Sequence, residues 1–303
     1  MLHPMVHVMM QLAPAKVNLA LSVGSPLENG MHPICSWMMT FDLCDELQLT
    51  KLSPGSLSRY AIYWHRNAKQ RSEINWSIKD DLAVMAHLAL EKAMGRDLPL
   101  QMRLEKKIPV GGGLGGGSSD AGAMLRGVNE LYELGLSSDE LIAIGSSLGS
   151  DVSFLVHGGS AIVQGLGDQI ERHASTPEIN AVLAFPEFQC ETPRVYGLFD
   201  EHIKGIDHQL RVDEVIALAQ SVETSSIHDT LFNDLAIPSM KSAPRLKGLV
   251  EKLSALAERP AHVSGSGSSL FVICDDAMHA QALAKATTDK VDIQAIAVTS
   301  HSC

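Results

Sequence analysis

Apolar and polar residues alternate along the first part of the chain, as they do in strands with one buried face. The alternation covers residues 6–12, beginning at Val6, and returns over residues 17–23. Leu47, Leu49 and the segment 60–64 continue the same signal. The N-terminal part of the chain is therefore expected to form a sheet.

From about residue 80 the apolar residues recur at every third or fourth position, which is the period of a helix. The first helix is expected at about 80–94. Asp80 or Asp81 can cap its start, because an aspartate side chain accepts hydrogen bonds from the free N–H groups of the first turn. Gly95 can end it.

The helical period returns five more times. Gly135 should end the first of these helices, and Ser137 with Glu140 forms a capping box at the start of the second. The five segments are 121–132, 137–149, 213–220, 247–258 and 277–287. Apolar runs outside the helices predict strands at 101–107, 181–185, 270–273 and 293–298.

Strands and helices are mixed along the chain without a regular alternation of strand, helix and strand, so the pattern favours an α+β fold. A length of 303 residues predicts two domains or one large one. Because the pattern restarts beyond residue 165, we expect an N-terminal domain at 1–165 and a C-terminal domain at 166–303.

The net charge narrows the choice of partners. The chain carries 35 acidic and 24 basic side chains, a formal charge of −11. Proteins that bind nucleic acids usually offer an excess of Lys and Arg to the phosphates, so we expect no nucleic-acid partner. A small anionic ligand stays possible, since it needs only a local positive site.

The cysteines and the apolar runs indicate a cytoplasmic protein without a membrane partner. No two cysteines have C-x-x-C spacing and their number is odd, which argues against a disulfide framework or a structural zinc site. No window approaches the ~20 apolar residues that span a bilayer, and the N-terminus does not resemble a signal peptide. The cysteines are Cys35, Cys44, Cys190, Cys274 and Cys303.

The segment 109–120, PVGGGLGGGSSD, is the most informative in the chain. Its six glycines leave the backbone bare, so several amide N–H groups can converge on an anion. It leads into an expected helix, whose N-terminus adds a positive dipole. The alternative is a flexible linker, which does not usually open directly into a helix. The residues expected to hold phosphate are Pro109, Gly111, Gly112, Gly113, Leu114, Gly115, Gly116, Gly117, Ser118 and Ser119.

Three known loop types differ from this segment. A Walker loop has Lys directly after its last glycine, whereas Ser118 follows Gly117 here. A dinucleotide loop needs an acidic residue at the end of a second strand about 20 residues further on, and residues 130–133 lie inside an expected helix. A protein kinase needs H-R-D and D-F-G, and the sequence contains neither.

Two charged residues stand at positions where they could serve a phosphate site. Lys16 interrupts an apolar strand pattern, and it is either a paired buried lysine or a lysine at an edge facing solvent. Asp151 follows Gly149 at a junction of elements, where an aspartate is often a turn or cap residue. Together they could activate a hydroxyl, the carboxylate orienting its proton and the ammonium neutralising developing charge.

These segments together resemble the GHMP small-molecule kinase superfamily. Its pattern is a lysine-bearing N-terminal strand, a phosphate loop of the type found at 109–117, and a late glycine-rich motif. The late motif here is VSGSGSS at 263–269. Further resembling segments are PAKVNL at 14–19, GMH at 30–32, FDLCDEL at 41–47 and LGSDV at 148–152.

The resemblance implies a two-domain GHMP kinase fold with the active site between the domains. The N-terminal domain would resemble the second domain of ribosomal protein S5, and the C-terminal domain would be ferredoxin-like. It also implies ATP as phosphoryl donor, Mg²⁺ as the accompanying ion, and an alcohol carrying a cytidine diphosphate group as acceptor. We expect a monomer or weak homodimer.

The resemblance also assigns roles to residues. Lys16 and Asp151 would be the catalytic pair, and Asn18, Met31 and His32 would bind the acceptor, with His32 at the cytosine. No metal ligand is identified. Met31 departs from the family, which usually has tyrosine there, although a thioether can also pack on a ring. The alternatives are another GHMP kinase, of the homoserine or mevalonate type, and a catalytically silent binding module.

Overall fold

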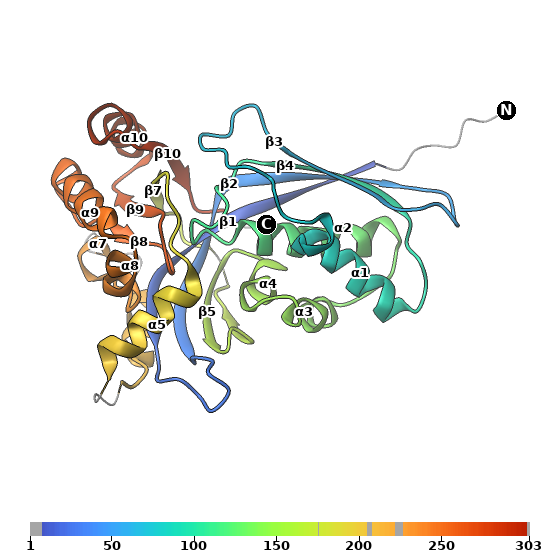
Figure 1. The fold of residues 1–303 in the computed structure, drawn as a ribbon, viewed down its shortest axis with the longest axis horizontal. Coiled ribbons are helices and arrows are strands. Elements are labelled where there is room, and N and C mark those ends of the chain that lie inside the picture. The colour runs from blue at the N-terminus through green and yellow to red at the C-terminus, as the bar shows by residue number, and fades with distance from the viewer. Residues whose placement is uncertain (1–7, 175, 205–207, 222–226, 302–303) are drawn as a thin grey trace.

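The computed structural model describes residues 8–174, 176–204, 208–221 and 227–301. It contains two sheets that lie beside each other, each covered by helices (Figure 1). Val6 and Cys303, which the sequence analysis named, lie outside the described residues.

The first sheet is organised around β2, a strand of 18 residues. The strand order is β3-β4-β2-β5-β6, and β1 pairs antiparallel with β2 along nearly its whole length. The first half of β2 pairs with β5 and the second half with β4. The strands are β1 (Val8–Val23), β2 (Ile34–Lys51), β3 (Arg59–Trp64), β4 (Leu100–Lys106), β5 (Ser160–Gly165) and β6 (Gln169–Arg172).

Four α-helices cover one face of this sheet. Leu47, Leu49 and Leu104 of the strands pack in one buried cluster with Met124 and Val128 of α2, which explains the helical period seen in the sequence. Burial of such side chains is the main favourable contribution to folding. The helices are α1 (Leu82–Met94), α2 (Gly116–Leu131), α3 (Ser138–Ser146) and α4 (Ser150–Leu155), preceded by a 3₁₀ turn, η1 (Ile78–Asp80).

The second sheet has the strand order β10-β7-β9-β8. Its strands are β7 (Asn180–Phe185), β8 (His262–Val263), β9 (Leu270–Cys274) and β10 (Gln294–Thr299). Its helices are α5 (Thr192–Ile203), α6 (Val212–Gln220), α7 (Ile227–Thr230), α8 (Ala236–Ser242), α9 (Pro244–Ala257) and α10 (Ala277–Val291).

The two sheets share one apolar core. Val17 and Phe41 of the first sheet belong to the same buried cluster as Leu183 and Phe271 of the second. The expected division after residue 165 would separate β5 from its hairpin partner β6, and the change of sheet comes after Arg172. The division into two domains itself stays a prediction.

Each strand and helix expected from the periodicity has a counterpart in the structure, and the α+β class is confirmed. Asp81 caps α1 by accepting a hydrogen bond from the N–H of Ala83 at 3.0 Å, and Gly95 follows its end with φ at 62°. The capping box of Ser137 and Glu140 opens α3 as expected.

Other boundaries and elements differ from the expectations. Helix α2 ends at Leu131, and Glu133 already takes a positive φ before Gly135 is reached. Helix α3 ends at Ser146 rather than Gly149. The periodicity did not predict helices α4, α5, α7 and α8 or the short hairpin of β5 and β6. Nowhere in the described ranges does a helix have the length and apolar character needed to cross a membrane.

Candidate active site

The glycine segment forms an open loop between β4 and the first turn of α2. Gly111, Gly113 and Gly115 have φ values of 72°, 77° and 68°, in the left-handed region that other residues seldom adopt. The loop lines a cavity of about 310 Å³ together with Trp76 and Asp81. Bare amide groups beside a helix N-terminus make this cavity suitable for an anion such as phosphate.

The late glycine motif holds the loop in place. The hydroxyl of Ser264 donates to the carbonyl of Gly113 at 3.0 Å, and the N–H of Ser269 donates to the carbonyl of Gly112 at 3.0 Å. A Cβ atom on Gly113 would lie 2.3 Å from the carbonyl oxygen of Ser264. The glycines therefore serve two purposes, since they leave amides free on one side and allow close packing on the other.

A buried cluster of charged side chains supports the glycine loop. Lys106 of β4 lies 2.5 Å from Asp45 of β2 and 2.5 Å from Asp120 of α2. Asp45 also accepts hydrogen bonds from the N–H groups of Lys107 and Ile108, which lead into the loop. The cluster ties β2, β4 and α2 together at the point where the loop begins and ends.

The two carboxylates of this cluster differ in their surroundings. Burial raises the pKa of Asp120 well above its ordinary value, against the opposing effect of Lys106. Its Oδ1 is buried and has no hydrogen-bond partner among the described residues. Burial alone would lower the pKa of Lys106, but the two aspartates outweigh it and raise that pKa. Asp120 is thus the carboxyl group of the cluster whose burial favours its neutral form.

Lys16 and Asp151 lie together beside the loop. Nζ of Lys16 is 3.2 Å from Oδ2 of Asp151 and donates to Oδ1 of Asn18 at 2.7 Å. Lys16 is only 4% exposed, so it is a paired buried lysine and not an edge lysine facing solvent. Its backbone N–H donates to the carbonyl of Leu114 at 2.9 Å, which fixes β1 against the glycine loop.

Asn18 and Asp151 are each positioned by their own element. Asn18 donates from Nδ2 to the hydroxyl of Ser36 at 2.8 Å, and that hydroxyl donates to the carbonyl of Ala20. Asp151 stands in the first turn of α4. All three side chains, Lys16, Asn18 and Asp151, line a second cavity of about 460 Å³.

A third cavity, of about 520 Å³, contains the other residues expected at the acceptor. Met31 and His32 line it together with Tyr196 and Asp200 of α5. Met31 is 51% exposed at the rim. The rings of His32 and Tyr196 lie 4.9 Å apart between centroids, and burial raises the pKa of Tyr196 to about 12.

The three cavities adjoin one another. The first and second share Gly111, Gly113 and Gly115, and the second and third share Ser150 and Tyr196 among others. The Lys16–Asp151 pair thus lies between the phosphate loop and the cavity of His32. Every residue expected at the site borders these cavities except Ser119, which is buried behind the loop.

Helix α5 forms one wall of the third cavity, and the sequence did not predict it. Tyr196 and Asp200 follow Thr192 and Pro193, and a proline in the first turn is a helix-start signal. That signal could have revealed the helix, but nothing local in the sequence places α5 opposite His32.

Comparison with known proteins agrees with this fold and arrangement. Residues 81–159 match the family model of the GHMP kinases N terminal domain, and residues 215–292 match that of the GHMP kinases C terminal. A crystal structure of homoserine kinase from Cytophaga hutchinsonii superposes with a TM-score of 0.70 at 16% identity, over 100% of this chain and 97% of that one. The fold and the two family models therefore define a GHMP kinase.

More similar relatives narrow the family. A 4-diphosphocytidyl-2-C-methyl-D-erythritol kinase of Bacillus cereus (strain B4264) is 35% identical over 88% of this chain and 89% of its own length. One from Exiguobacterium sibiricum is 34% identical over 89% and 91%. A crystal structure of 4-(cytidine 5'-diphospho)-2C-methyl-D-erythritol kinase has a TM-score of 0.77 at 32% identity, over 96% of this chain and 99% of that one. This chain belongs to the 4-diphosphocytidyl-2-C-methyl-D-erythritol kinase family and is a phosphotransferase.

Proposed function

We propose that this chain transfers the γ-phosphoryl group of ATP to the 2-hydroxyl of 4-diphosphocytidyl-2-C-methyl-D-erythritol, with Lys16 and Asp151 as its catalytic pair. The observation that carries the proposal is the place of this pair, between a phosphate loop on one side and the cavity of His32 on the other. A phosphoryl group held by the loop would have to pass this pair to reach an acceptor in the third cavity.

The loop residues bind the ATP phosphates in this proposal. Pro109 and the backbone of residues 111–117 form the cradle, and Ser118 adds a hydroxyl at the start of α2. Ser119, buried behind the loop, supports the first turn of the helix rather than reaching the cavity. Phosphoryl transfer requires mainly positioning and neutralisation of charge, which backbone N–H groups and a helix N-terminus supply.

The site also fits Mg²⁺ that arrives with the nucleotide. Mg²⁺ in kinase sites keeps several waters and substrate oxygens and needs only one or two protein ligands. Ser118 offers one such oxygen, and no group of three His, Cys, Asp or Glu among the described residues forms a separate metal cage. Bound there, the ion would neutralise charge on the phosphates.

Asp151 and Lys16 act on the acceptor hydroxyl. The carboxylate of Asp151 orients the hydroxyl and takes its proton, while the ammonium of Lys16 neutralises charge that develops on the attacking oxygen. Asn18 holds Nζ of Lys16 in place at 2.7 Å. Because Lys16 is almost fully buried, water competes little for its charge, which strengthens its effect on a bound substrate.

His32, Met31 and Tyr196 form the acceptor half. The family usually carries an aromatic ring at the position of Met31, and in this chain Tyr196 of α5 offers a ring to the same cavity. A base lodged in the third cavity could stack on that ring and contact Met31 at the rim.

Three further expectations belong to the same proposal. We keep the cytoplasmic location, which the four buried free thiols among the described residues support, and the state of monomer or weak homodimer. We also keep the division into two domains, which the two sheets support.

A substrate panel tests the proposal. The purified protein is supplied with ATP, Mg²⁺ and, in separate reactions, the cytidyl acceptor, homoserine and mevalonate, while ADP release and the phosphorylated product are measured. We expect turnover with the cytidyl acceptor. Turnover only with homoserine or mevalonate would support another GHMP kinase, and no turnover with any alcohol would support a silent binding module.

A further inference from the structure

One hydrogen bond closes the wall of the third cavity. Nε2 of His32 lies 2.7 Å from Oδ1 of Asp200 on α5. The side chain of His32 is 6% exposed and its ring packs beside Tyr196 and Phe199, with centroid separations of 4.9 and 5.9 Å. A helix far along the chain therefore holds the imidazole in one orientation.

The contact with Asp200 determines what the other ring nitrogen of His32 offers a ligand. In a neutral imidazole one nitrogen carries the proton and the other accepts hydrogen bonds. A carboxylate beside Nε2 keeps the proton there, so Nδ1 becomes the acceptor. The hydrogen bonds among the described residues leave both this Nδ1 and Oδ2 of Asp200 without a donor.

Asp200 also reaches the cavity directly. It lines the third cavity, and 42% of its side chain is exposed. When His32 is neutral with its proton on Nε2, the wall formed by His32 and Asp200 thus presents two hydrogen-bond acceptors and no donor. Such a wall favours a ligand edge that carries N–H groups, because an acceptor facing an acceptor leaves both unsatisfied.

Cytosine and uracil differ at this kind of edge. Cytosine carries an exocyclic amino group, which donates, whereas a carbonyl oxygen stands at the same position in uracil. We infer that Asp200 is a specificity-determining residue that selects an acceptor base with an exocyclic amine, through its own free oxygen and through the tautomer that it fixes on His32. This inference rests on the proposed function, since it names the base edge that the same cavity reads.

The stability of α5 does not require Asp200. Val195, Phe199 and Ile203 are the buried residues that anchor the helix. A contact made by a partly exposed carboxylate contributes little to the stability of a protein. Loss of the carboxylate should therefore affect the acceptor far more than the fold.

Asp200→Asn tests the inference sharply. The amide keeps an oxygen that can accept from Nε2 of His32 but replaces the free oxygen with an N–H donor. We expect the KM for the cytidyl acceptor to rise about 10- to 100-fold, the scale of one hydrogen bond to a charged group, with kcat nearly unchanged. The ratio of kcat/KM for the cytidyl acceptor over its uridyl analogue should fall at least as much. An unchanged ratio overturns the inference.

A spectroscopic measurement is independent of turnover. In ¹⁵N NMR spectra, with the signals of His32 assigned by their loss in His32→Gln, Nδ1 should be unprotonated in the unaltered protein. Asp200→Ala should give a mixture of tautomers. A protonated Nδ1 in the unaltered protein contradicts the inference. If the protein phosphorylates neither acceptor, the proposed function fails, while the tautomer of His32 is still decided.

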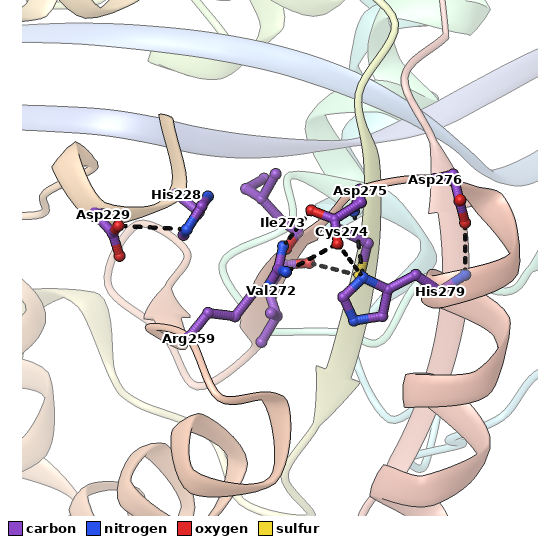
Figure 2. A network of polar contacts seen from close by, with 9 residues as sticks. All are labelled: His228, Asp229, Arg259, Val272, Ile273, Cys274, Asp275, Asp276 and His279. Carbon is purple, nitrogen blue, oxygen red and sulfur yellow. Dashed lines mark hydrogen bonds and ion pairs between the residues drawn. The ribbon is translucent and has the colours of Figure 1, made fainter. Parts of the chain in front are cut away.

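Asp275→Asn is the matched control. Asp275, between β9 and α10, also pairs with a histidine, His279, at 3.0 Å, and with Arg259 (Figure 2). It lines none of the three cavities. The Asp275→Asn variant should keep the KM values for the cytidyl acceptor and its uridyl analogue unchanged. The ratio of the two kcat/KM values should also stay the same. Equal changes in the Asp275 and Asp200 variants would indicate a general effect on the protein and would refute the specific role.

Discussion

The proposed nucleotide end and the proposed acceptor end of the site are built in different ways. The nucleotide end uses the backbone of one continuous segment, residues 109–117, whose glycines stand next to one another in the sequence. The acceptor end uses the side chains of Met31, His32 and Tyr196, which two distant segments supply. A binding site formed by the backbone of one segment can thus be predicted from local sequence. A binding site formed by side chains of distant segments can be predicted only when it is known which segments contact each other.

The two ends also differ in how tightly they are held. The phosphate loop is fixed by the ion cluster of Lys106, Asp45 and Asp120 below it and by the late glycine motif beside it. The acceptor end has Met31 at an open rim and Asp200 partly exposed. Changes at the nucleotide end should therefore affect stability and function together, and changes at the acceptor end mainly affinity.

The proposed catalytic pair, Lys16 and Asp151, where the two ends meet, should give the largest effect. Asp151→Asn keeps the shape of the side chain but removes its charge. A positioned base contributes about 10²–10⁴-fold, so kcat should fall by that factor while the affinity for ATP, measured by calorimetry, stays nearly the same.

The double variant of Lys16→Ala with Asp151→Asn should be little worse than either single variant, because residues that act as one unit are not additive. Losses that multiply would mean that the two residues act separately. A near-normal kcat in Asp151→Asn would exclude this carboxylate as the base.

Next in size is the effect of a side chain at Gly113. Gly113→Val forces a β-branched residue to a φ of 77° and places its Cβ 2.3 Å from the carbonyl of Ser264. Strain and overpacking of this kind cost about 2–5 kcal/mol, so urea unfolding should show a loss of stability together with a loss of ATP binding.

Gly117→Ala is the control for the same loop. Its φ is not positive, and its Cβ would meet only Leu82 at 3.4 Å, an ordinary contact. Its stability should change by less than about 1 kcal/mol. Equal destabilisation in both variants would contradict the tight packing of the loop against the late motif.

A moderate, pH-dependent effect is expected at Asp120. Because the pKa of Asp120 is raised in the folded chain, the folded state holds a proton that the unfolded chain releases above a pH of about 4. The free energy of unfolding therefore falls as the pH rises from there to the raised pKa. An asparagine at this position would carry no titratable group, so Asp120→Asn removes this pH-dependent loss of stability. The free energy of unfolding of the variant, relative to that of the unaltered protein, should therefore be more favourable at pH 8 than at pH 5.

Urea unfolding at several pH values measures this difference, with each unit of raised pKa corresponding to about 1.4 kcal/mol. Asp139→Asn, at an exposed position in the first turn of α3, controls for the removal of one carboxylate. A gain that shrinks with rising pH would mean that Asp120 is charged in the folded protein.

The smallest effect is expected at the open rim of the acceptor end. Met31→Tyr restores the residue usual in the family, and the new ring can stack on a base. Because Met31 is half exposed and Tyr196 already supplies a ring, the KM for the cytidyl acceptor should fall only a few-fold, by roughly 0.5–1 kcal/mol of stacking. An increase in KM would place the base away from residue 31.

The sequence by itself determined most of the strands and helices, the class of the fold and the glycine loop. Helix caps act within a few residues of their own helices, so they can be predicted without the rest of the chain. Examples are Asp81, Gly95 and the capping box of Ser137 and Glu140. The glycines of residues 111–117 likewise act through their own backbone.

Only the tertiary structure decided which side chains meet. It joined Lys16 to Asp151, brought the late motif onto Gly113, and set α5 with Asp200 against His32. Sequence reasoning left Lys16 undecided between a buried and a solvent-facing residue, because burial is a property of the packed sheets and not of a strand pattern. Contacts between segments 100 or more residues apart arise from the shared core, and no local propensity encodes them.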